Sequence, residues 1–120
     1  MAQTTSLIQN NGPNPATMVH VLLSNDDLST TGVVELEVFL SIGGILTPIA
    51  HELFSILPLV TDIKTFNVGG AVAFEVQYNV SGTTDIAINI FSTDADGRIN
   101  GAQGVLGSET QMISQLTPVP

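Results

Sequence analysis

The chain of 120 residues contains no cysteine, and Lys64 and Arg98 are its only basic residues apart from histidine. Without cysteine there is no disulfide framework and no thiolate metal site. Eleven Asp and Glu residues bring the formal net charge to −9. This balance argues against binding to nucleic acid or anionic membranes, because basic side chains supply most of the affinity for both.

Long apolar segments are also missing. No run approaches the roughly 18 residues that a membrane span requires. The first residues, MAQTTSLIQ, have neither the basic region nor the apolar region of a secretory signal. We therefore expect no membrane insertion, and we expect synthesis and folding in a cytoplasm. We expect a spore or cell surface as the final location, because such a surface can be built from cytoplasmic protein.

Hydrophobic residues make up 43% of the chain and charged residues only 11%. Disordered chains have low hydrophobicity, so this composition predicts one folded domain with a single core. The acidic residues are scattered along the sequence, which predicts that they lie on a solvated surface. With so few charges, the rest of that surface must consist largely of hydroxyl and amide groups, which suit contacts inside an assembly.

Alternating polar and apolar residues indicate strands with one buried face. The alternation is clearest in residues 33–40 (VVELEVFL), 71–80 (AVAFEVQYNV) and 85–91 (DIAINIF). Weaker patterns predict strands at 17–24, 45–55 and 60–67, with one or two short pieces between 98 and 116. Turn residues separate the segments, and the spacing of about 8 to 12 residues per strand is typical of sandwiches. We expect an all-β, two-sheet sandwich of seven to nine strands, Ig-like or jelly-roll.

The composition changes at Gly12-Pro13-Asn14-Pro15, which divides the chain into an N-terminal arm (1–15) and a sandwich domain (16–120). Pro13 and Pro15 favour extended geometry and disfavour a tight hairpin. Fifteen extended residues reach roughly 45 to 50 Å, whereas a body of this size has a diameter of about 35 Å. An arm of this length can reach a neighbouring molecule, with Gly12, Pro13, Asn14 and Pro15 as its linker.

The arm sequence AQTTSLIQ contains no proline and no charge, and it is rich in Thr and apolar residues. These features suit addition to an exposed sheet edge, where main-chain hydrogen bonds give affinity and side chains such as Leu7 and Ile8 fill pockets. The expected docking strand consists of Thr4, Thr5, Ser6, Leu7, Ile8 and Gln9. The alternative is a short first strand that pairs within its own domain.

Residues suited to catalysis are few. His20 and His51 are the only bases that titrate near neutral pH, and no serine lies in a G-x-S-x-G turn. We expect His20 to face solvent or an interface, and His51 and Glu52 to point to opposite faces of a strand. We predict that the protein is not an enzyme, with no catalytic residue, no cofactor and no small-molecule substrate.

Two glycine-containing stretches resemble ligand loops. DADGRING begins like a calcium loop, but Gly97 comes too early and no glutamate occupies the twelfth position. A hairpin turn with Gly97 at positive φ accounts for the same residues, with weak Ca²⁺ binding as the alternative. In GAQGVLG, the spacing of Gly101, Gly104 and Gly107 favours a glycine-kinked edge strand over a phosphate loop. We therefore predict no metal site.

The segment from Phe66 to Thr110 resembles small spore-surface proteins of Bacillus and related Firmicutes. In those proteins a strand like FEVQYNVSG precedes a strand ending in Phe, an acidic turn with Gly and a closing VL-SE. Together with the arm, the layout is similar to that of the endospore appendage (Ena) pilus subunits, which are jelly-roll domains joined by N-terminal connectors. Those connectors carry cysteines, which this arm lacks. The resemblance implies that Thr4 to Gln9 dock on a neighbouring subunit and that Gly12 to Pro15 act as the spacer.

We hypothesise that the protein is a structural subunit that assembles with further copies of itself into a pilus-like fibre on a spore or cell surface. Identical subunits with a charge of −9 repel each other, so assembly must rely on main-chain hydrogen bonds and apolar contacts. One alternative is a phage or virion decoration or tail protein. Another is a Ca²⁺-assisted carbohydrate- or ligand-binding module.

Overall fold

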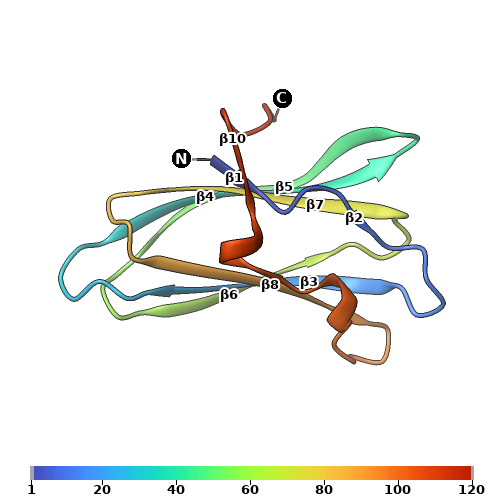
Figure 1. Cartoon of the computed structure of the whole chain (residues 1–120), viewed down its shortest axis with the longest axis horizontal. Coiled ribbons are helices and arrows are strands. Elements are labelled where there is room, and N and C mark those ends of the chain that lie inside the picture. Colours follow the sequence, from blue (N-terminus) through green and yellow to red (C-terminus); the bar gives the residue numbers. More distant parts are fainter. Residues whose placement is uncertain (1, 120) are drawn as a thin grey trace.

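The alternating segments form the strands of two antiparallel sheets that pack face to face (Figure 1). The computed structural model describes residues 2–119, so Met1 and Pro120, the outer residues of the expected arm and domain, lie outside the described residues. Every predicted strand is present, including two short pieces after residue 98. The fold is an all-β sandwich, as the alternation predicts.

The strands divide into a larger sheet, sheet A, and a smaller sheet, sheet B. Sheet A has the order β10-β1-β7-β4-β5, with β2 also paired to β7. Its strands are β1 (Ala2–Thr4), β2 (Ile8–Gln9), β4 (Gly32–Ile42), β5 (Ile45–Ile56), β7 (Ala73–Ser81) and β10 (Gln111–Ile113). Sheet B has the order β6-β3-β8-β9. Its strands are β3 (Ala16–Asn25), β6 (Thr61–Asn67), β8 (Ile86–Asp94) and β9 (Val105–Leu106).

The connections between the long strands favour the jelly-roll alternative over the Ig-like one. The chain passes from one sheet to the other between β3 and β4, β5 and β6, β6 and β7, and β7 and β8. Within residues 2–119, the hairpin of β4 and β5 is the one place where consecutive long strands pair directly. The described residues contain ten strands rather than seven to nine, because four of them are only two or three residues long.

The core lies between the sheets and consists of the inward-facing residues of the alternating strands. Fully buried examples are Val19, Val21, Val34, Leu36, Val38, Phe74 and Val76.

Lys64 lies where β5 and β6 approach each other. Its ammonium group lies 4.5 Å from the centre of the Phe54 ring and 3.6 Å from Glu52 Oε1. This side chain covers apolar core atoms while its charge stays paired.

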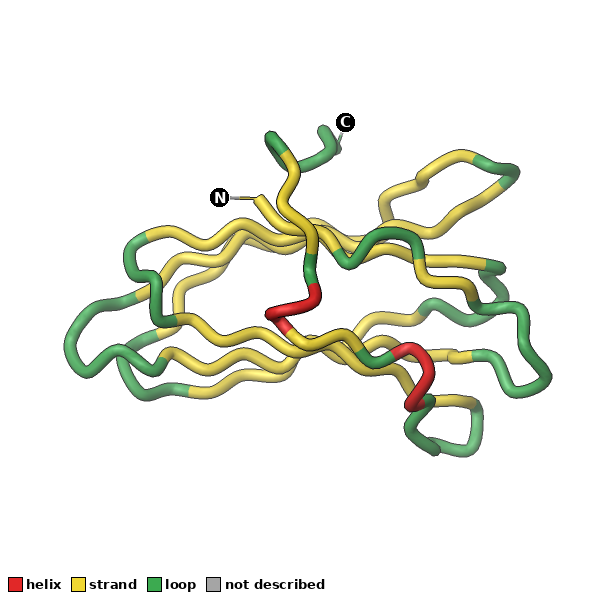
Figure 2. Tube along the Cα trace, viewed as in Figure 1, coloured by secondary structure: helices red, strands yellow, loops and turns green. Residues whose placement is uncertain are grey.

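The C-terminal segment crosses from sheet B to sheet A on the side of the sandwich that is opposite to β5 and β6 (Figure 2). It contains β9, the single 3₁₀ turns η1 (Gly101–Gln103) and η2 (Gly107–Glu109), and then β10. Thr110, between η2 and β10, lies 3.0 Å from the hydroxyl of the buried Tyr78. No helix among residues 2–119 is long and apolar enough to cross a membrane.

The two basic side chains differ sharply in their accessibility to proteases. Lys64 lies inside β6, whereas Arg98 is exposed in the turn that follows β8. A protease needs an extended, accessible backbone, so we expect trypsin to cut the native protein after Arg98 and to spare Lys64. Mass spectrometry of a limited digest measures the order of cleavage. Arg98→Gln should leave the native chain intact, and early cleavage after Lys64 would contradict the proposed difference in accessibility.

Candidate assembly site at the N-terminal strands

The N-terminal segment pairs with sheet A of its own chain. In β1, Ala2 lies opposite Asn79 of β7, and in β2, Ile8 lies opposite Phe74 of the same strand. The structure thus differs from the expected free arm and agrees with the alternative of a first strand within its own domain. The two prolines exclude a tight hairpin but permit the wider loop that leads from β2 into β3. Docking on a neighbouring copy stays a prediction.

The residues expected to dock make specific contacts on β7. Thr5 donates its N–H to Val76 O at 2.9 Å, and its side-chain oxygen accepts the Val76 N–H at 3.1 Å. Thr4 Oγ1 donates to Glu75 Oε2 at 2.5 Å. These bonds cover an edge of β7 that would otherwise expose unpaired backbone groups.

The segment is two short strands rather than the single strand that the sequence suggests. Ser6 has a φ of 62°, in the left-handed region that few non-glycine residues adopt, and its N–H bonds to Thr4 Oγ1 at 2.9 Å. After this kink, Ile8 packs against the core, whereas Leu7 remains 55% exposed. Within the single chain, therefore, Ile8 is packed and Leu7 is left open to solvent; their insertion into pockets of a neighbouring copy stays a prediction.

β1 also holds the C-terminal strand in the sheet. Thr4 lies opposite Gln111 of β10, and among residues 2–119 β10 pairs with β1 alone. Thr110 Oγ1 lies 3.2 Å from Gln3 Oε1, and Ser6 Oγ donates to Gln111 Oε1 at 3.4 Å. Sheet A thus has a slot between β7 and β10, and β1 occupies it. In a chain without β1, β10 would lose its pairing partner and β7 would be unpaired along this edge.

A buried asparagine closes the loop between β2 and β3. Asn10 is 3% exposed, and its Oδ1 accepts hydrogen bonds from Ala16 N at 2.8 Å and from Gln103 Nε2 at 2.9 Å. Its Nδ2 donates to Ala16 O at 3.0 Å and to Ala71 O at 3.2 Å. Every hydrogen-bonding position of the amide is used. The sequence analysis missed Asn10 and Gln103, because an amide beside a polar loop normally faces solvent.

The linker itself is exposed. Gly12, Pro13, Asn14 and Pro15 border an open groove of about 790 Å³, whose other wall is the segment from Asp94 to Val105. The four linker residues contribute nothing to the buried core. The linker can therefore change conformation without disturbing the packing between the sheets.

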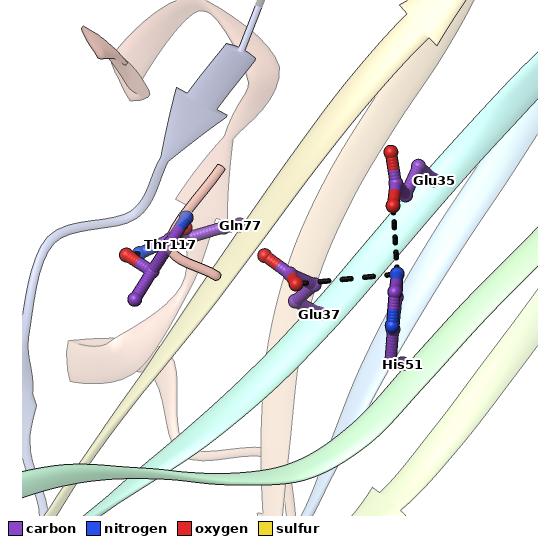
Figure 3. Close-up of polar contacts among 5 residues, drawn as sticks. All are labelled: Glu35, Glu37, His51, Gln77 and Thr117. Atoms are coloured by element: carbon purple, nitrogen blue, oxygen red, sulfur yellow. Dashed lines mark hydrogen bonds and ion pairs between the residues drawn. The ribbon is translucent and has the colours of Figure 1, made fainter. Parts of the chain in front are cut away.

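A second polar cluster lies on the outer face of sheet A (Figure 3). His51 Nε2 is 2.7 Å from Glu35 Oε2 and 4.0 Å from Glu37 Oε2. Glu37 is only 2% exposed, contrary to the expectation that the acidic residues are solvated, and its Oε1 has no hydrogen-bond partner. Burial raises the pKa of Glu37, and the nearby His51 opposes this effect.

The C-terminal tail lies over the same face of sheet A, beside Glu37. Gln77 lies directly opposite Glu37 in the register of β7 and β4. It donates from Nε2 to Thr117 Oγ1 at 2.9 Å and accepts the Thr117 N–H at 2.8 Å (Figure 3). The tail therefore covers a face that strand alternation alone would leave open to solvent.

The remaining candidates occupy separate places. His51 contacts Glu35, whereas Glu52 contacts Lys64, so the two side chains point to opposite faces, as expected. His20 lies on the outer face of sheet B, between Thr65 and Thr93. The structure brings the two histidines to different sheets and not to a common site.

The glycine-containing loops have structural explanations. Asp94 Oδ1 accepts the N–H groups of Asp96 at 2.9 Å and Arg98 at 3.0 Å, and Gly97 has a φ of 79°. This is the hydrogen bonding of a side-chain-capped turn. Gly107 passes so close to β8 that an added Cβ would lie 2.6 Å from Ile88 O, as suits the end of an edge strand. Among residues 2–119, no group of three His, Cys, Asp or Glu could hold a metal ion.

Removal of the Asn10 amide should destabilise the fold. Asn10→Ala removes the side-chain partner of the Ala16 N–H and C=O and one of the hydrogen bonds of Gln103, which keeps its bond to Gln9 O. We expect a loss of about 2 to 4 kcal/mol in the free energy of unfolding. Asn11→Ala alters an exposed neighbour and should cost less than about 0.5 kcal/mol. Urea denaturation measures both variants, and equal losses would show that the Asn10 network does not hold the loop.

Glu37 should make stability depend on pH. Its pKa is raised in the folded state, so the folded protein binds the proton more tightly than the unfolded chain. The cost of ionising Glu37 is therefore absent below the ordinary pKa of about 4.3 and grows as pH rises through the folded value. We expect Glu37→Gln to raise stability at pH 8 more than at pH 4, as measured by urea denaturation. Asp96→Asn, at an exposed site remote from Glu37, is the control, and a pH-independent effect of Glu37→Gln would contradict this expectation.

Comparison of the chain with protein-family models, with curated proteins and with solved structures found no match. The features of this chain that suggest a function are the slot between β7 and β10, the strand that fills it and the linker behind that strand.

Proposed function

We propose that the protein is a structural subunit that polymerises by passing its N-terminal strands to the next copy, and that the polymer is a pilus-like fibre on a spore or cell surface. The observation that supports this proposal most is the position of β1. A terminal segment fills an internal slot of sheet A and is attached to the rest of the fold by an exposed linker that contains two prolines. In this proposal the protein has a mechanical role and catalyses no reaction.

Exchange of a terminal strand preserves its contacts. The bonds of Thr4 and Thr5 to β7 form equally well with the β7 strand of another copy, and only the linker has to change conformation. Pro13 and Pro15 reduce the entropy lost when the linker straightens, because their φ angles already suit an extended chain. The open groove beside the linker leaves room for this change.

The geometry of exchange leads to an open polymer. Each copy donates the strands that precede its linker and accepts those of a neighbour on β7, so the donor and acceptor surfaces differ. Contacts between unlike surfaces produce filaments when the rotation between copies does not close a ring. The exchanged strand would also pair with β10 of the accepting copy, so one segment would contact two strands of the neighbouring sheet.

Charge repulsion does not oppose this contact locally. Residues 2–15 contain no charged side chain, although the whole chain carries −9. Thr4 Oγ1 donates to the Glu75 carboxylate at 2.5 Å, and hydrogen bonds to charged groups are stronger than neutral ones. Repulsion between the more distant carboxylates is screened within about 10 Å at 0.1 M salt.

Exchange competes with pairing inside one chain. A tethered strand meets its own slot at an effective concentration in the millimolar range. Polymerisation by this route therefore requires a high local concentration of subunits, as occurs during assembly on a surface. It also requires additional contacts between copies, because exchange alone replaces one set of bonds by the same set.

A pair of engineered cysteines distinguishes the two pairings. Gln3 lies opposite Met112 in the register of β1 and β10, and the chain contains no other cysteine. In Gln3→Cys/Met112→Cys, oxidation after assembly at about 1 mM should give a ladder of covalent oligomers on a non-reducing gel. Pairing within one chain gives crosslinked monomers alone.

The two single-cysteine variants are the controls and should give nothing larger than dimers. Electron microscopy of the same samples shows whether filaments are present. Filaments whose subunits crosslink only internally, or the absence of filaments at that concentration, would contradict the proposal.

A further inference from the structure

The outer face of sheet B carries no charged residue. The register of β6, β3 and β8 places side chains on this face in four rows of three, and β9 adds Leu106 beside Asn89. The rows are Thr61, Ser24 and Ala87; Ile63, Leu22 and Asn89; Thr65, His20 and Phe91; and Asn67, Met18 and Thr93. We call these residues, with Leu106, the neutral face.

The neutral face is apolar at its centre and open to solvent in the single chain. Ile63 is 60% exposed, and Leu22, opposite it on β3, is partly exposed. Phe91 is partly exposed in the next row, and Leu106, 56% exposed, lies beyond Asn89. Ile63 and Leu22 lie opposite each other and Phe91 lies diagonal to Leu22, so these three residues form one apolar cluster, with Leu106 set apart by Asn89. An exposed apolar cluster on an otherwise polar protein is typical of an interaction surface.

Three polar residues beside this apolar cluster, His20, Thr65 and Thr93, are already paired with one another. The two ring nitrogens of His20 lie 3.0 Å from Thr65 Oγ1 and 2.9 Å from Thr93 Oγ1. The His20 ring stacks on Phe91 with 4.6 Å between ring centres. Burial of these groups against another surface would therefore break few hydrogen bonds to water, so its desolvation cost is low.

The distribution of charge favours a second copy of this chain as the partner. All eleven acidic residues lie outside the neutral face, whereas the outer face of sheet A carries Glu35 and Glu37. Two copies at −9 each can approach face to face here without bringing carboxylates into opposition, since like charges in contact are costly. We propose that the neutral face docks on the neutral face of a second copy, in a symmetric pair.

The size of the face sets the strength of the contact. Seven residues along each strand and three strands across give about 23 Å by 14 Å, or roughly 300 to 400 Å² per copy. Stable complexes bury about 800 Å² per partner. The pair is therefore weak in solution and contributes mainly where copies are already held together. It supplies the additional contact that strand exchange requires, but it does not depend on strand exchange.

The experiment uses protein in which strand exchange is blocked. Gln3→Cys/Met112→Cys, oxidised at high dilution so that the disulfide forms within one chain, keeps β1 in its own slot. Sedimentation equilibrium should show reversible dimers with a Kd of about 0.1 to 1 mM, the range of weak encounter contacts. Added salt should strengthen this association, because it screens the remaining repulsion.

Matched carboxylate substitutions locate the contact. In this locked protein, Ile63→Glu and, separately, Ala87→Glu should weaken dimerisation by about tenfold or more, because each places like charges opposite each other at the pair. Leu53→Glu is the control, since Leu53 is 70% exposed on sheet A and the change in net charge is the same. Thermal unfolding verifies that each variant remains folded.

Locked protein that stays monomeric throughout this concentration range overturns the proposal, as does equal weakening by Leu53→Glu. Neither result bears on strand exchange, because the locked chain cannot exchange its strands. Conversely, dimers of the locked protein that respond to Ile63→Glu support the neutral face even if the crosslinking ladder is absent.

Discussion

The pairing of the N-terminal strands with β7 is the interaction on which the rest of sheet A depends. An unpaired edge exposes a row of N–H and C=O groups that must bond to something. In this chain β1 and β2 satisfy that edge, and β1 in turn carries β10. The two ends of the chain are thereby joined to one central strand, through contacts between residues as far apart in sequence as Ser6 and Gln111.

The same interaction explains why a structural role is a reasonable proposal. Main-chain ladders recognise a strand by its backbone, and they hold a segment equally well whether it comes from the same chain or from another. In the closed arrangement, Asn10 bonds across the linker to Ala16 and also to Gln103. Exchange between copies would form the same bonds between chains, so the balance rests on the linker and on contacts elsewhere.

The small number of charges gives the two outer faces different characters. On sheet A, Glu37 is buried beside the tail and its Oε1 lacks a hydrogen-bond partner, which lowers the stability of the fold. On sheet B, the outer face has no carboxylate, and its histidine is engaged with two threonines. A subunit with one neutral face and one acidic face can associate with its own kind in only a few orientations.

The sequence by itself determined the strands and the two-sheet architecture, because alternation with a period of two requires one buried face on each strand. The turn at Asp94 to Arg98 and the outward position of His20 were also predictable, since both follow from local geometry. Three features were decided by the tertiary structure alone: which sheet the N-terminal segment joins, the burial of Glu37, and the role of Asn10. Each depends on partners distant in sequence, namely β7, the tail at Thr117, and Gln103. The partner of a backbone ladder or of an amide side chain cannot be read from the local sequence, because any strand or polar group can make these hydrogen bonds. Only the folded chain brings these groups together.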